Sequence, residues 1–149
     1  MRTVLFVCTG NTCRSPMAEG IARHLQRTGK LPPDLFFASA GTSAYDGDPM
    51  ADATRAILDE LNVSSDGTAK RLSPEMIRRA DLVLGMTRGH VGGARAIVGS
   101  DAAAAAKIQP LDPTGDIADP IGLGPEAYEA VKDRLFQLIP TRVKEMLPS

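Results

Sequence analysis

The stretch from Val4 to Pro16 constrains the fold of this chain more than any other part of the sequence. It begins with an apolar run rich in Val and Phe, which predicts a buried strand that ends at Cys8. A short loop with Gly and Asn follows. Ser15-Pro16 is then typical of a helix start, with a hydroxyl residue at the N-cap and proline at the first helical position. The stretch therefore predicts a strand, a tight loop and a helix in close succession.

A loop between a strand and a helix start is suited to binding an anion. The first N–H groups of a helix have no partner within the helix and lie at the positive end of its dipole. The loop can direct its own N–H groups at the same centre, because Gly and Asn tolerate a left-handed backbone. Arg14 adds a planar guanidinium that can bind two oxygens of a phosphate. We therefore expect a phosphate site made by Thr9, Gly10, Asn11, Thr12, Cys13 and Arg14.

Cys8 ends the predicted strand and faces this positive field, which favours its thiolate form. A thiolate beneath a bound phosphate is a nucleophile aimed at phosphorus. The alternative is that Cys8 is a small buried apolar residue and Arg14 a surface charge of the helix. That alternative leaves the Gly-Asn loop without an explanation, so we expect Cys8 and Arg14 to be catalytic.

The composition is that of an ordinary soluble globular protein. At 149 residues with 43% hydrophobic residues, the chain is expected to form one domain that spans residues 1–149. Its net charge of −1 does not indicate the basic surface that a nucleic-acid-binding protein needs. No apolar stretch approaches the ~20 residues that cross a bilayer. We therefore expect a cytoplasmic protein with neither nucleic acid nor a membrane as partner.

The chain has two cysteines, Cys8 and Cys13, which fits a reducing compartment better than a disulfide framework. The two could still pair transiently within the loop, which would protect the nucleophile from over-oxidation and switch activity off. A buried thiol at Cys13 without any redox role is about equally compatible with the sequence.

The rest of the chain alternates strands and helices. Helices are expected at 17–27, from Asp48-Pro49 to about 61, at 73–79, 88–98 and 126–138, with a kink or break at Pro140. Strands are expected at 35–38, 81–86 and 107–111, and the alanine-rich run 102–106 reads as helix or loop. Alternating elements predict a doubly wound sheet, whose ligands bind beyond the carboxyl ends of the strands.

A thiolate that attacks a phosphate ester needs an acid to protonate the leaving group. Asp112, Asp116 and Asp119 all lie on the loop 112–125, and the first and last of them each precede a proline. The residues alone do not choose among the three. The two histidines, His24 and His90, read as surface residues of helices without metal-ligand spacing, so metal-free catalysis is expected.

Residues 4–19 resemble the signature of the low-molecular-weight protein tyrosine phosphatase family, which includes bacterial protein arginine phosphatases and one branch of arsenate reductases. The likeness extends over nearly the whole chain, through residues 39–41, 80–86 and 119–120. It implies a doubly wound four-stranded parallel sheet of order 2-1-3-4 with helices on both faces. It also implies a protein phosphatase without a cofactor, which acts through a phosphocysteine and releases inorganic phosphate from phosphorylated proteins.

The resemblance also assigns roles to individual residues. The family's general acid lies in an Asp-Pro pair followed by Gly and later by a helix with Tyr, which matches Asp119 and leaves Asp112 as a turn residue. Ser15 resembles the serine that donates to the thiolate. Asn11 resembles the asparagine that holds the loop, supported by a serine of the region 39–43, either Ser39 or Ser43. A histidine that often joins this support has no counterpart near residue 67.

The sequence indicates the reaction more clearly than it indicates which phosphorylated residue is the substrate. Tyrosine-specific members usually have aromatic residues after the Asp-Pro pair, where this chain has Ile121, although Tyr45 could supply one wall. Thr12 stands where those members typically have Ile, and it resembles the arginine phosphatases. Its hydroxyl can orient a guanidinium or the attacking water. Thr and Ile are also near-isosteres, so the preference for phosphoarginine over phosphotyrosine is slight.

Two other functions remain as alternatives. Arsenate reduction in this fold uses further cysteines downstream, and none follows Cys13, so that activity would require an external thiol. A non-catalytic phosphate-binding module would be expected to lose the thiol or the acid, and this chain keeps both. A phosphoprotein phosphatase is therefore the favoured interpretation.

Overall fold

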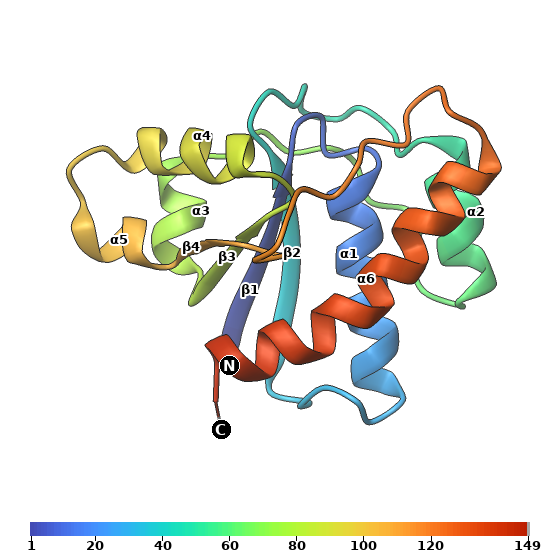
Figure 1. The fold of residues 1–149 in the computed structure, drawn as a ribbon, viewed down its shortest axis with the longest axis horizontal. Coiled ribbons are helices and arrows are strands. Elements are labelled where there is room, and N and C mark those ends of the chain that lie inside the picture. Colours follow the sequence, from blue (N-terminus) through green and yellow to red (C-terminus); the bar gives the residue numbers. More distant parts are fainter. Residues whose placement is uncertain (149) are drawn as a thin grey trace.

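The computed structural model describes residues 1–148, which form a four-stranded sheet with helices on both faces (Figure 1). The strands are β1 (Arg2–Cys8), β2 (Leu35–Gly41), β3 (Leu82–Gly85) and β4 (Ile108–Pro110). The helices are α1 (Arg14–Arg27), α2 (Asp52–Glu60), α3 (Pro74–Arg79), α4 (Arg88–Val98), α5 (Ala102–Ala106) and α6 (Pro125–Met146). All neighbouring strands pair in parallel in the order β2-β1-β3-β4, which confirms the predicted topology.

The central strand β1 is buried on both faces, which explains its unbroken apolar sequence. Val4 and Phe6 pack on the side of α1 and α6, whereas Leu5 and Val7 pack on the side of α3, α4 and α5. This division follows from the alternation of side chains along a strand. Figure 1 shows the same two layers, with α1, α2 and α6 on one side of the sheet and α3, α4 and α5 on the other.

The chain reverses its winding direction at β1, and four segments meet at the carboxyl end of that strand. The backbone N–H of Thr42, after β2, donates to the carbonyl of Cys8 at 2.9 Å. The N–H of Met86, after β3, donates to the carbonyl of Val7, and the N–H of Ile117, after β4, donates to that of Met86. The loop after β1 is therefore surrounded by the loops that follow the other three strands, as expected at a switch point.

The prediction of a helix start at Asp48-Pro49 was wrong. Pro49 pairs with Thr68 in an isolated antiparallel bridge, and the carbonyl of Asp48 accepts the N–H of Ala69 at 2.8 Å. This pairing keeps the segment extended, so α2 begins only at Asp52.

The apolar residues of the segment predict a buried face of Met50, Ala53, Ala56, Ile57 and Leu61. Of these, Ile57 is buried, and Ala53 and Leu61 pack against the same core. Ala56 is exposed, whereas Thr54 and Leu58 are buried.

The first helix begins two residues earlier than the Ser15-Pro16 pair predicted. Cys13 occupies the N-cap position, and its carbonyl accepts the N–H of Met17 at 3.1 Å. Ser15 is consequently inside the first turn, fully buried, with its hydroxyl free for a role other than capping.

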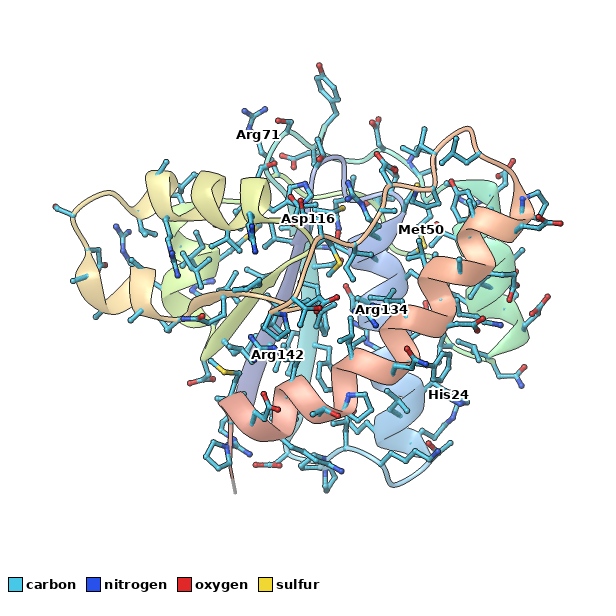
Figure 2. The ribbon with its side chains drawn as sticks, in the orientation of Figure 1. His24, Met50, Arg71, Asp116, Arg134 and Arg142 are labelled. Carbon is cyan, nitrogen blue, oxygen red and sulfur yellow. The ribbon has the colours of Figure 1, made fainter. Side chains whose placement is uncertain are left out.

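The closing helix α6 runs through Pro140 without a break, although proline removes one hydrogen bond of the helix. Its last turns are held by Arg142, which donates to the carbonyls of Leu111 and Pro110 at the end of β4 (Figure 2). Buried Ile139 and Val143 add apolar contact on the same side. Neither α6 nor any other helix within residues 1–148 is both long and apolar enough to cross a membrane.

Candidate active site

A cavity of about 200 Å³ opens at the carboxyl end of β1. It is lined by the nucleophile candidate and most of its loop, together with two residues of the loop after β4: Cys8, Thr9, Gly10, Thr12, Cys13, Arg14, Asp119 and Ile121. The strand places the thiol at the floor of the cavity, and the start of α1 directs its free N–H groups to the same place. The cavity therefore lies where the Cys8 sulfur, the Arg14 side chain and the start of α1 come together.

The buried Cys8 sulfur lies 2.9 Å from the hydroxyl oxygen of Ser15. The direction of this contact follows from its neighbours. Asn11 Oδ1 accepts the N–H of Lys70 at 2.9 Å, which fixes the Asn11 amide and directs its Nδ2 to Ser15 Oγ at 2.8 Å. Because Ser15 accepts from Asn11, its own proton can be donated to a Cys8 thiolate, which lies closer than the alternative acceptor, the carbonyl of Ala40 at 3.4 Å.

Asn11 is held in a left-handed conformation with a φ of 56°. Its Nδ2 also donates to Ser39 Oγ at 3.0 Å, and Ser39 in turn donates to Glu19 Oε1 at 2.7 Å. Glu19 forms an ion pair with Arg23 across one turn of α1. The sequence reasoning missed Glu19, although its position four residues after Ser15 places both on one side of the helix.

Of the two serines expected to support the loop, only Ser39 reaches Asn11. The Ser43 side chain is exposed, and this residue contributes its backbone N–H instead, to the carbonyl of Thr9 at 3.0 Å. Ser43 thus supports the loop by a contact that any residue could make.

Gly41, the last residue of β2, allows the loop to come this close. A Cβ at this position would lie 2.3 Å from the carbonyl oxygen of Thr9 and 2.9 Å from the backbone nitrogen of Asn11. Both neighbours are backbone atoms, which cannot move aside without displacing the loop. The loop therefore requires glycine here.

Arg14 connects residues 9–13, the candidate phosphate-binding loop, with the loop after β4. It is buried, and its Nη1 donates to the carbonyl of Ile117 at 2.8 Å. Its Nη2 lies 3.6 Å from Asp119 Oδ2, and the Asp119 side chain is half exposed at the cavity. Asp119 Oδ1 accepts the N–H of Ile121 at 3.1 Å, which orients the carboxyl group.

The other two aspartates of this loop are engaged elsewhere. Asp116 accepts the N–H of Arg88 and so caps the start of α4 (Figure 2). Asp112 is buried, pairs with Arg134, and accepts both the N–H and the hydroxyl of Thr114. Burial alone would raise the pKa of Asp112, but these hydrogen bonds and the Arg134 charge outweigh it and lower the pKa. Of the three candidates, Asp119 lines the cavity.

The prediction that His90 is a surface residue was wrong. His90 is buried, and its Nε2 lies 2.7 Å from Thr9 Oγ1 in the phosphate-binding loop. Burial and then the charge of Arg14 lower its pKa to about 4, against smaller opposing effects of Asp116 and Asp119. The imidazole is therefore neutral at pH 7. The other histidine, His24, is only partly buried, on α1, where it packs edge-on against Phe136.

A family model described as low molecular weight phosphotyrosine protein phosphatase matches residues 3–147. The chain belongs to this family. Among similar curated proteins, a protein-arginine-phosphatase of Geobacillus stearothermophilus is 36% identical, covering 91% of this chain and 90% of its own. A low molecular weight protein-tyrosine-phosphatase of Staphylococcus haemolyticus is 32% identical, covering 91% of this chain and 94% of its own. This chain is thus a protein phosphatase.

Solved structures of the low-molecular-weight phosphatases share the fold. The tyrosine phosphatase from T. tengcongensis has a TM-score of 0.86 at 35% identity and covers 97% of this chain and 99% of its own. The arginine phosphatase from Geobacillus stearothermophilus has a TM-score of 0.81 at 34% identity and covers 98% of this chain and 93% of its own. Both substrate classes thus occur among relatives of similar identity, so similarity alone does not select between them.

The two residues expected to form a substrate wall lie in different places in this phosphatase. Ile121 lines the cavity beside Asp119 and is 58% exposed, which leaves it available to a substrate. Tyr45 is 74% exposed and is not part of the cavity lining. Within residues 1–148, the lining of this cavity includes the aliphatic side chain of Ile121 and no aromatic ring.

Cys13 is a buried free thiol whose sulfur lies 3.3 Å from the hydroxyl of Tyr128 on α6. Burial raises the pKa of Tyr128, and the contact with Cys13 raises it further. The neutral Tyr128 hydroxyl can donate to the sulfur. Cys8 is also a free thiol, so a disulfide between Cys8 and Cys13 stays a prediction.

Proposed function

We propose that this phosphatase hydrolyses phosphoarginine or phosphotyrosine on proteins through a phosphocysteine at Cys8, without a metal or another cofactor. One observation carries the proposal. The Cys8 sulfur, which forms a hydrogen bond with the Ser15 hydroxyl at 2.9 Å, lies in the same cavity as Arg14 and Asp119. In this proposal the N–H groups of residues 9–14 and the Arg14 guanidinium bind the phosphoryl oxygens.

In the first step, the Cys8 thiolate attacks phosphorus, so that an S–P bond forms and the bond to the leaving oxygen or nitrogen breaks. Asp119 donates its proton to the leaving group. Ser15 donates a hydrogen bond to the thiolate and thereby stabilises the charged form of the nucleophile.

In the second step, water attacks the phosphocysteine, and the Asp119 carboxylate takes its proton by microscopic reversibility. The S–P bond breaks, inorganic phosphate leaves, and the Cys8 thiolate is restored. A solved structure of an arginine phosphatase mutant with a phosphorylated active-site serine, 28% identical to this chain, supports transfer of the phosphoryl group to the nucleophile position.

For the substrate we propose phosphoarginine ahead of phosphotyrosine. Thr12 lines the cavity with a hydroxyl that can orient a guanidinium or water, and Ile121 replaces an aromatic wall. Curated relatives named protein-arginine-phosphatase from two organisms match over more than nine tenths of this chain. The two free cysteines support a cytoplasmic location for the reaction.

The test is phosphate release from matched phosphoarginine and phosphotyrosine peptides, with chelator and reductant present and Cys8→Ser as the blank. We expect a preference for phosphoarginine that weakens in Thr12→Ile, because the isoleucine has no hydroxyl. A preference for phosphotyrosine would contradict the substrate proposal. Activity that requires added metal, or that survives in Cys8→Ser, would contradict the mechanism.

A further inference from the structure

The Thr9 side chain has a hydrogen-bond partner from a distant part of the chain. Its Oγ1 lies 2.7 Å from Nε2 of His90, in the first turn of α4. The imidazole itself is held on its other side, where Nδ1 lies 3.1 Å from Oγ1 of Thr87, the N-cap of the helix. The same Thr87 oxygen accepts the backbone N–H of His90 at 3.2 Å. The ring thus has a fixed position between the helix cap and the loop.

The backbone of Thr9 is already fixed by other contacts. Its carbonyl accepts the N–H of Ser43, and Gly41 lies directly against it. Thr9 is exposed and lines the cavity with Cys8 and Asp119. With the backbone fixed, the Thr9 hydroxyl can still rotate. The hydrogen bond to His90 restricts this rotation.

We propose that His90 is a positioning residue for substrate recognition: its Nε2 accepts the Thr9 proton, so that the Thr9 oxygen faces the cavity as a hydrogen-bond acceptor. In this arrangement Nδ1–H donates to Thr87, whose oxygen has two lone pairs for its two donors. A neutral imidazole has one donor and one acceptor, whereas a charged one would donate from both nitrogens. The low pKa of His90, about 4, keeps the ring in the required neutral form.

A free acceptor at this place discriminates between leaving groups. The guanidinium of phosphoarginine carries several N–H donors that need partners when they leave water. The phenyl ring of phosphotyrosine has none. The Thr9 oxygen therefore contributes to binding and reaction of phosphoarginine and contributes little for phosphotyrosine. This inference rests on the proposed function, and it adds a second hydroxyl to that of Thr12.

The experiment compares wild type with His90→Ala, Thr9→Val and the double variant, each on both peptides, and His24→Ala serves as the matched histidine control. We expect His90→Ala and Thr9→Val each to lower kcat/KM for phosphoarginine about tenfold, and His90→Ala to lower it for phosphotyrosine less than about twofold. The double variant should be no worse than either single one, because both remove the same interaction. In His90→Ala the inhibition constant of inorganic phosphate, which occupies only the anion site, should stay within about twofold of wild type.

The conservative variant His90→Gln, whose side-chain amide can accept the same proton, should recover most of the phosphoarginine activity. Equal losses on both peptides, or weaker phosphate inhibition in step with lost activity, would show a merely structural role and overturn the proposal. Independent losses that multiply in the double variant would overturn it as well. The substrate preference of the wild type tests the proposed function. The role of His90 is tested separately, by how much substitution of His90 changes that preference.

Discussion

At the scale of single residues, the site depends on hydrogen bonds whose directions are determined. Glu19 is an acceptor when ionised, so Ser39 donates to it and accepts from Asn11. Asn11 donates to Ser15 as well, which leaves the Ser15 proton for Cys8. A charge at the edge of α1 thus helps to set the hydrogen bond that the nucleophile receives.

Asp119→Asn tests the assignment of the acid. We expect kcat to fall by about 10² to 10⁴ on a substrate with a poor leaving group, because the amide cannot supply the proton. On p-nitrophenyl phosphate, whose leaving group needs little protonation, the first step should be affected much less. The ratio kcat/KM on the two substrates measures this difference, because it covers only the steps up to formation of the phosphocysteine, whereas kcat also includes its hydrolysis. The matched variant Asp34→Asn, at an exposed position before β2, should behave as wild type, and an equal loss there would contradict the assignment.

His90 predicts a pH dependence of stability. Its pKa is lowered from 6.5 to about 4 by burial and then by Arg14, against smaller opposing effects of Asp116 and Asp119. Between these values the unfolded chain binds a proton that the folded chain does not, so stability rises with pH there. The contribution is complete above pH 6.5 and is lost as the pH falls toward about 4.

We therefore expect the free energy of unfolding to fall more in wild type than in His90→Gln between about pH 7 and about pH 4.5. Urea denaturation at the two pH values measures it. An equal fall in both proteins would show that the folded state does not keep this imidazole neutral.

At the scale of elements, the close approach of β2 to the phosphate-binding loop is a steric requirement. In Gly41→Ala the new Cβ would meet the carbonyl oxygen of Thr9 at 2.3 Å. We expect this variant to lose phosphate binding and activity, because the loop must shift to make room. Inhibition by inorganic phosphate and kcat/KM both measure the effect.

Gly92→Ala is the matched substitution, since no atom lies within 4 Å of the new Cβ in the middle of α4. It should gain roughly 0.5–1 kcal/mol of stability from the better helix former and keep full activity. If both glycine variants had the same activity, the steric argument at β2 would fail.

The elements also show where sequence reasoning succeeds. The apolar run of β1, the Ser73 cap of α3 and the start of α4 at Arg88 rest on local patterns, and the structure has each of them. Asp48-Pro49 carries an equally good local signal, but pairing with residues 68–69 overrides it. Propensity is a weak prior when a distant segment offers hydrogen bonds to the same backbone.

At the scale of the whole molecule, the doubly wound order brings the candidate site together. The loops that follow all four strands meet at one edge, which joins Asn11 with Ser39 and Arg14 with Asp119. Once the topology was expected, the loop and the thiol could be predicted, because both lie at the carboxyl end of β1, whereas the choice of Asp119 among three aspartates rested on the resemblance to the family.

His90 could not be predicted in this way. It lies 81 residues from Thr9, and its helix shows no local signal that distinguishes a buried imidazole from an exposed one. Its burial results from the phosphate-binding loop that comes to lie over the start of α4, which is a property of the whole fold. Glu19, by contrast, could have been found from its helical spacing to Ser15.

The most direct test of the central claim, a phosphocysteine at Cys8, is mass spectrometry of acid-quenched Asp119→Asn during turnover of p-nitrophenyl phosphate. This variant should form the intermediate, because the leaving group needs little protonation, and should hydrolyse it slowly, because the base for water is missing. We predict one added phosphoryl group, located on Cys8 and absent when Cys8→Ser is added to the variant. A turning-over enzyme without any adduct, or with the phosphoryl group on another residue, would contradict the account.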